Sequence, residues 1–291
     1  MLFRKRVAGS LNTLRYVFDH PINRDNRFRA LWRLGQWQCR SRLTSSEIVF
    51  DWVGDSKLAV RKGMYGATGN IYCGIHEFSE MGFILHFLRP DDLFCDIGAN
   101  IGSYTILASK VTSAKTYSFE PDPVSAAHLA TNVTLNGVND LVQVHQIALG
   151  AESGHARFTI GQGPVNKITS DARISTREVP VRSLDSVLDG RCPTAMKIDV
   201  EGYEENVLRG ATRTLENPIL QAITIETMTP WLETTVAAAG FRKIYYDPRT
   251  RRLSEVRPDF AIHNTLLIRD QAMVKDRLVT APPFSIFGRH F

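Results

Sequence analysis

The sequence has no apolar run that approaches the roughly 20 residues a membrane-spanning helix requires. Residues 1–6 are basic, but no apolar stretch of signal-peptide type follows them, which argues against secretion. The four cysteines, at positions 39, 73, 95 and 192, form neither a Cys-x-x-Cys pair nor a cluster with histidines. Neither a disulfide framework nor a zinc site is therefore expected. Together with the absence of repeats and low-complexity segments, these features predict a cytoplasmic protein with free thiols and no bound metal.

Acidic residues are scarce in one part of the chain only. Residues 1–42 contain ten Lys and Arg against two acids, Asp19 and Asp25, a net charge of +8 within a chain whose total is +5. Such a basic segment is typical of a solvated or self-associating helical face, and equally of a segment that docks on an anionic surface such as a membrane. The remainder carries −3 and shows no basic face, so a nucleic-acid partner is not expected.

With 291 residues, 43% hydrophobic and 22% charged, the chain is long enough for one α/β domain of roughly 200 residues plus extensions. Apolar residues at helical spacing cover 1–45, and short strand-like runs broken by glycines fill 47–75. We predict three parts: a basic extension at 1–75, a catalytic domain at 76–270 with a hairpin insertion at 150–182, and a tail at 271–291. Within the domain, strands are expected at 93–96, 116–119, 142–149, 195–199, 219–226, 241–246 and 261–268, and helices at 79–88, 101–108, 122–137, 203–215 and 229–240.

The segment 93–102, Leu-Phe-Cys-Asp-Ile-Gly-Ala-Asn-Ile-Gly, joins an apolar run to a helix through a turn that contains two glycines. A second short run ends in Glu120, eighteen residues after Gly102. Glycines let the backbone approach a ligand, and an acid that ends the second strand accepts both hydroxyls of a ribose. This spacing predicts a nucleoside pocket at the carboxyl edge of a parallel sheet. A structural turn that binds nothing is the alternative.

The residue types in this turn favour a nucleoside that carries positive charge. A dinucleotide fingerprint would place glycines at positions 98, 100 and 103, but the chain has Asn100 and Ser103 there. The first strand ends in Asp96, whose carboxylate would repel a pyrophosphate and attract a cation. S-adenosylmethionine has a sulfonium and an ammonium group, so we expect it as the cofactor and a methyltransferase as the enzyme.

Six segments of the chain occur in the order typical of one enzyme family: Asp96-Ile-Gly-Ala-Asn-Ile-Gly-Ser-Tyr-Thr105, Phe119-Glu-Pro-Asp-Pro123, Ala148-Leu-Gly150, Ser183-Leu-Asp185, Lys197-Ile-Asp-Val-Glu-Gly-Tyr-Glu204 and Leu208-Arg-Gly-Ala211. From about residue 77 to 268 the chain thereby resembles the FkbM family of S-adenosylmethionine-dependent methyltransferases. The resemblance implies a class I methyltransferase fold, a Rossmann-like, seven-stranded, mostly parallel sheet with helices on both faces. It also implies methylation of a hydroxyl oxygen on a small-molecule, sugar or glycan acceptor. The expected cofactor contacts are Asp96, Gly98, Ala99, Asn100, Ile101, Gly102, Glu120, Pro121 and Ala148.

Methyl transfer to an alcohol requires in-line positioning and a group that takes the hydroxyl proton. Asp199 ends the fourth strand, Glu201 follows two residues later, and Glu226 ends the fifth strand. These three are our candidates for acceptor binding and proton removal, because the reactive end of the cofactor should lie at this edge of the sheet. Three other roles are open: Asp199 and Glu201 could cap the next helix, Glu226 could pair with an arginine, and all three could bind Mg²⁺. Without an acceptor diol to complete the coordination, a metal is not expected.

Four basic side chains lie close to these acids in the sequence or in the expected fold. His76, His145 and His263 could approach the site, although a lone histidine more often has a structural role. Lys197 is expected to point away from Asp199, from the alternation of side chains along a strand.

Two other functions compete with an O-methyltransferase. An RNA methyltransferase has a similar second half of the pocket, but base-modifying enzymes usually place a proline-rich aromatic loop after the fourth strand, where this chain has Asp199-Val-Glu-Gly-Tyr203. A non-catalytic nucleoside-binding module that acts through the basic segment is the third possibility. The acids at positions 96, 120, 199 and 201 argue against it.

Overall fold

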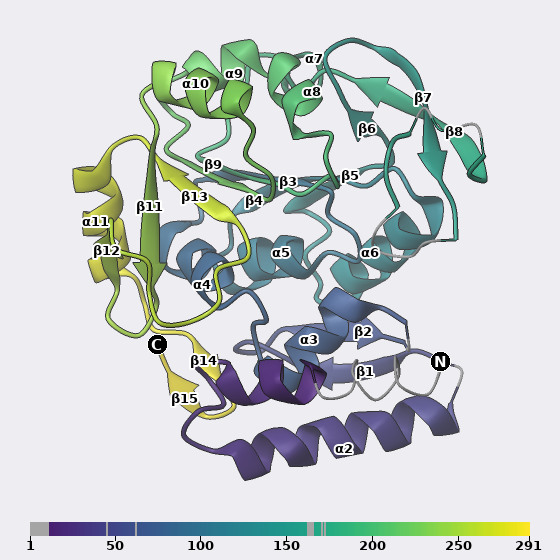
Figure 1. Cartoon of the computed structure of the whole chain (residues 1–291), viewed down its shortest axis with the longest axis vertical. Helices are drawn as coiled ribbons and strands as arrows, with labels where there is room; N and C mark the ends of the chain where they lie inside the picture. Colours follow the sequence, from purple (N-terminus) through teal and green to yellow (C-terminus); the bar gives the residue numbers. More distant parts are fainter. Residues whose placement is uncertain (1–11, 45, 62, 162–165, 170, 172) are drawn as a thin grey trace.

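A computed structural model describes residues 12–44, 46–61, 63–161, 166–169, 171 and 173–291. Its centre is one large sheet built from eight strands (Figure 1). In chain order they are β3 (Leu93–Ile97), β4 (Lys115–Phe119), β5 (Val142–His145), β9 (Ala195–Ile198), β10 (Ala222–Ile225), β11 (Arg242–Asp247), β12 (Arg252–Ser254) and β13 (Thr265–Ile268). Across the sheet the order is β12-β11-β13-β10-β9-β3-β4-β5.

The strand directions confirm the expected fold. The five strands from β5 to β10 are parallel, with β3 paired to β4 on one side and to β9 on the other. β13 is antiparallel to both of its neighbours, and β12 adds an eighth strand at the edge. All residues of β9 and β10 are buried, as expected for parallel strands that are covered on both faces. This is the seven-stranded class I methyltransferase arrangement with one strand added.

Helices cover the sheet on both faces (Figure 1). One layer contains α4 (Phe78–Phe87), α5 (Ser103–Ile106) and α6 (Pro123–Leu135), and the other contains α7 (Leu184–Leu188), α8 (Glu204–Arg209), α9 (Thr212–Glu216) and α10 (Pro230–Ala238). The predicted start of α6 is confirmed, because the Asp122 carboxylate accepts a hydrogen bond from Ser125 N at the helix start. The predicted helix at 101–108 begins later, at Ser103, and continues into a π-helical turn, Leu107–Val111.

The predicted strand at 142–149 is wrong as a single element. It divides into β5 and β6 (Ala148–Leu149), and β6 joins a separate three-stranded sheet with β8 (Thr176–Arg182) and β7 (Gly154–Thr159). The pairing of β4 with β5 ends with the hydrogen bond that Glu120 N donates to His145 O. The chain then turns, so that β6 pairs with β8 instead. Strands β7 and β8 form the hairpin expected in the insertion.

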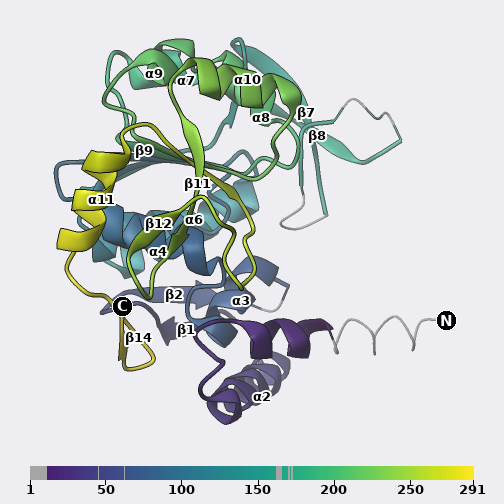
Figure 2. The same ribbon diagram turned by 60° about the vertical axis from the view of Figure 1, so that its left-hand side comes forward.

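The N-terminal segment forms a small unit beneath the main sheet (Figures 1 and 2). It contains a helix over residues 12–19, α2 (Arg27–Leu43), the hairpin of β1 (Ile48–Asp51) and β2 (Lys57–Val60), and α3 (Tyr65–Cys73). The helical expectation for 1–45 is confirmed over 12–19 and 27–43, which a turn at 20–26 separates, and residues 1–11 and 45 lie outside the described part of the chain. Short strands broken by glycines are predicted over 47–75, and this prediction is wrong for α3, a helix that continues through Gly69. A Cβ at Gly69 would lie 2.9 Å from His76 Cβ, so glycine lets the next segment pack closely on this helix.

The C-terminal tail, for which the sequence suggests no role, closes against the N-terminal unit. Helix α11 (Gln271–Thr280) contacts α4, and a short hairpin of β14 (Ser285–Ile286) and β15 (Arg289–His290) follows. The Arg289 guanidinium donates to Ile22 O at 2.9 Å and to Asp25 Oδ2 at 2.8 Å. One hydrophobic core takes residues from all three of the predicted parts. Among the described helices none is long and apolar enough to cross a bilayer.

Candidate active site

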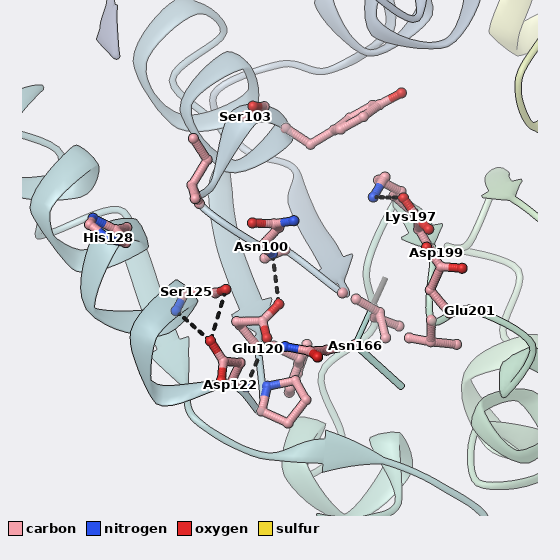
Figure 3. Close-up of a pocket in the computed structure, with 18 of the residues that line it drawn as sticks. Asn100, Ser103, Glu120, Asp122, Ser125, His128, Asn166, Lys197, Asp199 and Glu201 are labelled. Atoms are coloured by element: carbon pink, nitrogen blue, oxygen red, sulfur yellow. Dashed lines mark hydrogen bonds and ion pairs between the residues drawn. The ribbon is translucent and has the colours of Figure 1, made fainter. Parts of the chain in front are cut away.

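A pocket of about 460 Å³ lies at the carboxyl ends of β3, β4, β9 and β10 (Figure 3). Ligands bind at this edge of open α/β sheets because the ends of parallel strands converge there. The N-terminal unit and the β7–β8 hairpin contribute further walls, with Met64 and Ala67 from one side and Phe158 and Ile168 from another. Seven of the nine residues expected to contact the cofactor line this pocket: Gly98, Ala99, Asn100, Ile101, Glu120, Pro121 and Ala148.

Gly98 is required where the loop after β3 passes close to the loop after β9. Its φ is +79°, and a Cβ at this position would lie 1.8 Å from the carbonyl oxygen of Asp199. Any side chain would therefore push the two loops apart. Glycine is what allows the cofactor loop and the candidate catalytic loop to meet.

The other two expected cofactor residues, Asp96 and Gly102, lie behind the pocket wall. Asp96 is fully buried, and its Oδ2 accepts hydrogen bonds from Thr105 N at 2.9 Å and Thr105 Oγ1 at 2.7 Å. Burial raises the pKa of Asp96, and the Lys197 ammonium opposes that rise. Gly102, at φ +89°, packs against Leu129 of α6. We therefore expect both residues to shape the cofactor loop from behind.

Glu120 directly follows β4 and faces the cofactor loop (Figure 3). Its Oε2 accepts from Asn100 N and its Oε1 accepts from Asp122 N, each at 2.8 Å. Burial raises the pKa of Glu120 to about 7, against the opposing effect of these two amides. A carboxylate has about four acceptor positions, so each oxygen keeps one for a ribose hydroxyl. The two backbone bonds fix the orientation of the group before any ligand arrives.

The structure corrects the expected direction of Lys197. Its Nζ donates to Asp199 Oδ2 at 2.8 Å and lies 5.0 Å from the centre of the Tyr104 ring (Figure 3). Residues two apart on a strand share one face, so the alternation argument in fact places Lys197 and Asp199 together. Burial opposes the charge of Lys197, but nearby carboxylates, Asp199 foremost, raise its pKa and keep it protonated.

Asp199, Glu201 and Glu226 come together as the sequence predicts. One carboxylate oxygen from each lies within 4.8 Å of the others. Burial opposes the ionisation of Asp199, yet the Lys197 ammonium holds its pKa below the usual range. Burial and the Asp199 charge raise the pKa of Glu226 to about 8. These shifts favour an ionised Asp199 beside a Glu226 that holds a proton more readily than an ordinary glutamate does.

The structure also bears on the alternative roles of these acids. Helix α8 starts after Tyr203 without a side-chain cap, and the Glu204 carboxylate bonds the loop amides of Val200 and Gly202. In the described part of the chain Glu226 forms no ion pair with an arginine. The spacing of the three carboxylates suits a divalent cation, but Lys197 already occupies one oxygen of Asp199.

Of the three histidines named from the sequence, His76 is the one that lines the pocket. Its Nδ1 lies 3.1 Å from Asn70 Oδ1, and its Nε2 lies 3.6 Å from Glu77 Oε1. Burial lowers the pKa of His76, so the ring is neutral at pH 7. Neither His145, which stacks on Phe119, nor His263 is among the residues that line the pocket.

Four residues that line the pocket were not among the expected site residues. Glu77 lines the pocket and accepts a hydrogen bond from the Tyr104 hydroxyl at 2.5 Å. Tyr104 follows the cofactor turn directly in sequence, which could have identified it. Arg61 and His128, which bond each other at 2.6 Å, come from segments far apart along the chain, and no sequence signal joins them.

Residues 96–243, half of the chain, match the family described as the Methyltransferase FkbM domain. Two curated relatives are similar over part of their length. A hexuronic acid methyltransferase, AglP, from Haloferax volcanii is 27% identical over 153 residues, which cover 48% of this chain and 59% of that protein. Methyltransferase 1 from Beauveria bassiana is 30% identical over 149 residues, which cover 42% of this chain and 59% of that protein. The match therefore spans less than two thirds of either relative.

Solved structures with a similar fold include a methyltransferase FkbM from Methylobacillus flagellatus, at 18% identity and a TM-score of 0.46, with 69% of this chain and 52% of that chain covered. A putative transferase from Pyrococcus horikoshii has 14% identity and a TM-score of 0.44, with 78% of this chain and 72% of that chain covered.

Proposed function

Since the chain belongs to the FkbM methyltransferase domain family, we propose that it transfers a methyl group from S-adenosylmethionine to a hydroxyl oxygen of a sugar, glycan or natural-product acceptor. The observation that carries the proposal is the charge of the pocket. Its described lining holds six carboxyl groups against two permanent cations, Arg61 and Lys197. Such a lining favours a cationic ligand and disfavours a pyrophosphate.

The loops after β3 and β4 would hold the cofactor in their part of the pocket. Glu120, already oriented by two backbone amides, accepts the ribose hydroxyls. Gly98 holds the loop after β3 directly against the loop that carries Asp199, so a cofactor bound on the first loop would lie beside the second. The three clustered acids would then stand at the end of the pocket where the methyl group is supplied.

The acceptor hydroxyl binds at Asp199. The bound cofactor would supply its methyl group to the acceptor oxygen as the carbon–sulfur bond breaks, and the Asp199 carboxylate would take the hydroxyl proton. Lys197 keeps that carboxylate ionised and oriented at 2.8 Å. The products are the methyl ether, the neutral thioether of the cofactor and one proton, which Asp199 returns to solvent.

The acids at this end of the pocket also favour one class of acceptor. A neutral hydroxylated molecule donates hydrogen bonds to Asp199, Glu201 and Glu226 without charge repulsion. An acceptor with its own carboxylate beside the reacting hydroxyl would face like charges. The relative named for hexuronic acid supports a sugar acceptor, and the charge of this pocket favours a neutral sugar over a uronic acid.

A methyl-transfer assay tests this proposal. The purified protein is incubated with radiolabelled S-adenosylmethionine and, separately, a neutral glycoside, a glucuronide, a small-molecule alcohol and total RNA. We expect transfer to a hydroxylated acceptor, with a methyl ether in the product. Transfer to RNA alone would favour the RNA methyltransferase alternative, and cofactor binding without any transfer would favour the nucleoside-binding module.

The role of Asp199 is tested by Asp199→Asn with that acceptor. Loss of the base should lower turnover by about 10²–10⁴ while cofactor affinity is kept. Glu216→Gln is the matched control, because Glu216 is an exposed acid on α9 outside the pocket. Near-normal turnover of Asp199→Asn would remove Asp199 from the mechanism and leave Glu201 and Glu226 as candidates.

A further inference from the structure

The outward face of α2 carries an apolar stripe that no described part of the chain covers. Phe28 is 84% exposed, Trp32 69% and Leu43 86%. Exposed residues at intervals of three or four positions lie on one side of a helix, and these three share that side with Leu31, Gly35 and Cys39. We call this the outer stripe; its members are Phe28, Leu31, Trp32, Gly35, Cys39 and Leu43, all exposed.

The outer stripe is fixed in its outward position. The opposite side of α2 buries Ala30, Trp37 and Ser41 against the N-terminal unit. Arg33 secures it further, with bonds to Asn23 Oδ1 and Tyr72 O. The helix therefore cannot rotate to hide the outer stripe without exposing Trp37 and breaking these bonds.

Cations accompany the outer stripe. Arg27, Arg29, Arg40 and Arg42 are all exposed, and none forms an ion pair with a described residue. Helix α2 contains no acidic residue at all. A partner that covers this surface must offer apolar groups to the outer stripe and negative charge to the guanidinium groups beside it.

We propose that α2 docks on the surface of an anionic lipid bilayer. The outer stripe enters the boundary between headgroups and acyl chains, and the arginines bind lipid phosphates and carboxylates. This is the pattern of helices that lie in the plane of a membrane, with tryptophan, phenylalanine and leucine on one face and arginine beside them.

A second copy of the chain fits this surface less well. If two α2 helices paired through the outer stripe, arginines of one helix would face arginines of the other in either orientation, and α2 has no acid to compensate them. A nucleic acid would neutralise the arginines but leave Leu31 and Leu43 without an apolar partner. A bilayer satisfies both features.

Docking through α2 would hold the pocket close to the membrane. Helix α2 packs on α3 in the same N-terminal unit (Figure 2). Met64, which precedes α3, and Ala67 in its first turn line the pocket. One helix layer thus separates the outer stripe from the site. The proposal concerns where the enzyme works, and it stands whether or not the acceptor proposed above is correct.

Vesicle sedimentation tests the proposal with the full chain. We expect binding to vesicles of phosphatidylcholine with about one third phosphatidylserine, weak binding to phosphatidylcholine alone, and loss of binding in high salt. Phe28→Ser/Trp32→Ser should lower the partition coefficient at least tenfold, and so should Arg27→Gln/Arg29→Gln. These residues are exposed, so the thermal midpoint and cofactor binding should not change.

Matched controls come from exposed residues elsewhere. Val256→Ser removes an apolar side chain that is 77% exposed, and Arg252→Gln/Arg257→Gln removes two exposed arginines; both should bind vesicles as the unmodified chain does. A second readout is quenching by brominated lipid, which should reach exposed Trp32 and disappear in Trp32→Phe.

Failure of the unmodified chain to bind anionic vesicles would overturn the proposal, as would full binding by Phe28→Ser/Trp32→Ser. If the unmodified chain is instead a dimer that this double variant dissociates, without vesicle binding, the outer stripe is a contact between two copies.

Discussion

Replacing Lys197 by methionine should destabilise the protein far more than removing an ordinary surface lysine. The side chain of Lys197 is 6% exposed and donates to Asp199 Oδ2 at 2.8 Å, with the buried Asp96 nearby. Methionine fills a similar volume but leaves these acids without a cation. Breaking a fully buried ion pair on one side costs about 3–5 kcal/mol. Because the Asp199 side chain is 30% exposed, solvent screens part of this cost, and we expect a loss at the lower end of that range in the free energy of unfolding near pH 8.

The loss should shrink as the pH falls. In the unmodified protein Lys197 holds the pKa of Asp199 below its usual value, so that pair stabilises the fold above the unfolded pKa of an aspartate. Without Lys197 the pKa of Asp199 rises, and protonation then removes the uncompensated charge. Urea unfolding near pH 8 and near pH 5 measures the difference between variant and unmodified protein at each pH.

Two further variants make this test specific. Lys110→Met removes the surface pair between Lys110 and the exposed Asp55, which should cost about 0–1 kcal/mol at either pH. Lys197→Met/Asp199→Asn should recover part of the loss, because it removes both charges of the buried pair. A cost of Lys197→Met no larger than that of Lys110→Met, or one independent of pH, would refute the reasoning.

Three more predictions concern the cofactor and metals. Glu120→Ala should weaken S-adenosylmethionine binding by roughly 1.5–3 kcal/mol in calorimetry, through the loss of two charge-assisted hydrogen bonds. Cofactor affinity should fall as the pH drops below 7, because the pKa of Glu120 is raised to about 7 and the ribose binds its ionised form; a flat profile between pH 6 and pH 8 would contradict this role. Prolonged EDTA treatment should leave methyl transfer unchanged, and activity restored only by Mg²⁺ would show that the three acids hold a metal.

The sequence suffices to predict the main sheet and much of the pocket. Parallel strands leave long apolar runs, and three of these runs are followed by an acid, Glu120, Asp199 or Glu226, that the shared edge of the sheet brings to the pocket. This is why Asp199, Glu201 and Glu226 cluster although Glu226 comes from a different strand. The glycine turn at Gly98 is equally local, because its position between strand and helix is visible in the sequence.

What the sequence could not show depends on contacts between distant segments. Gly69 indicates a break by itself, yet it lies within a helix because His76 packs against it. Strand β6 pairs with β8 in a separate sheet, and no pattern within residues 142–149 indicates that the chain turns away from the main sheet there. Lys197 is a different case, since the correct alternation of a strand would have predicted its contact with Asp199.

The central claim is that this pocket binds S-adenosylmethionine, and isothermal titration calorimetry tests it most directly. The purified chain is titrated with S-adenosylmethionine, with its demethylated product and with NAD, and Glu120→Ala is titrated in parallel. Our account predicts saturable binding of one molecule of the first two per chain, weakened in Glu120→Ala, and no binding of NAD. Binding of NAD without binding of S-adenosylmethionine would contradict it.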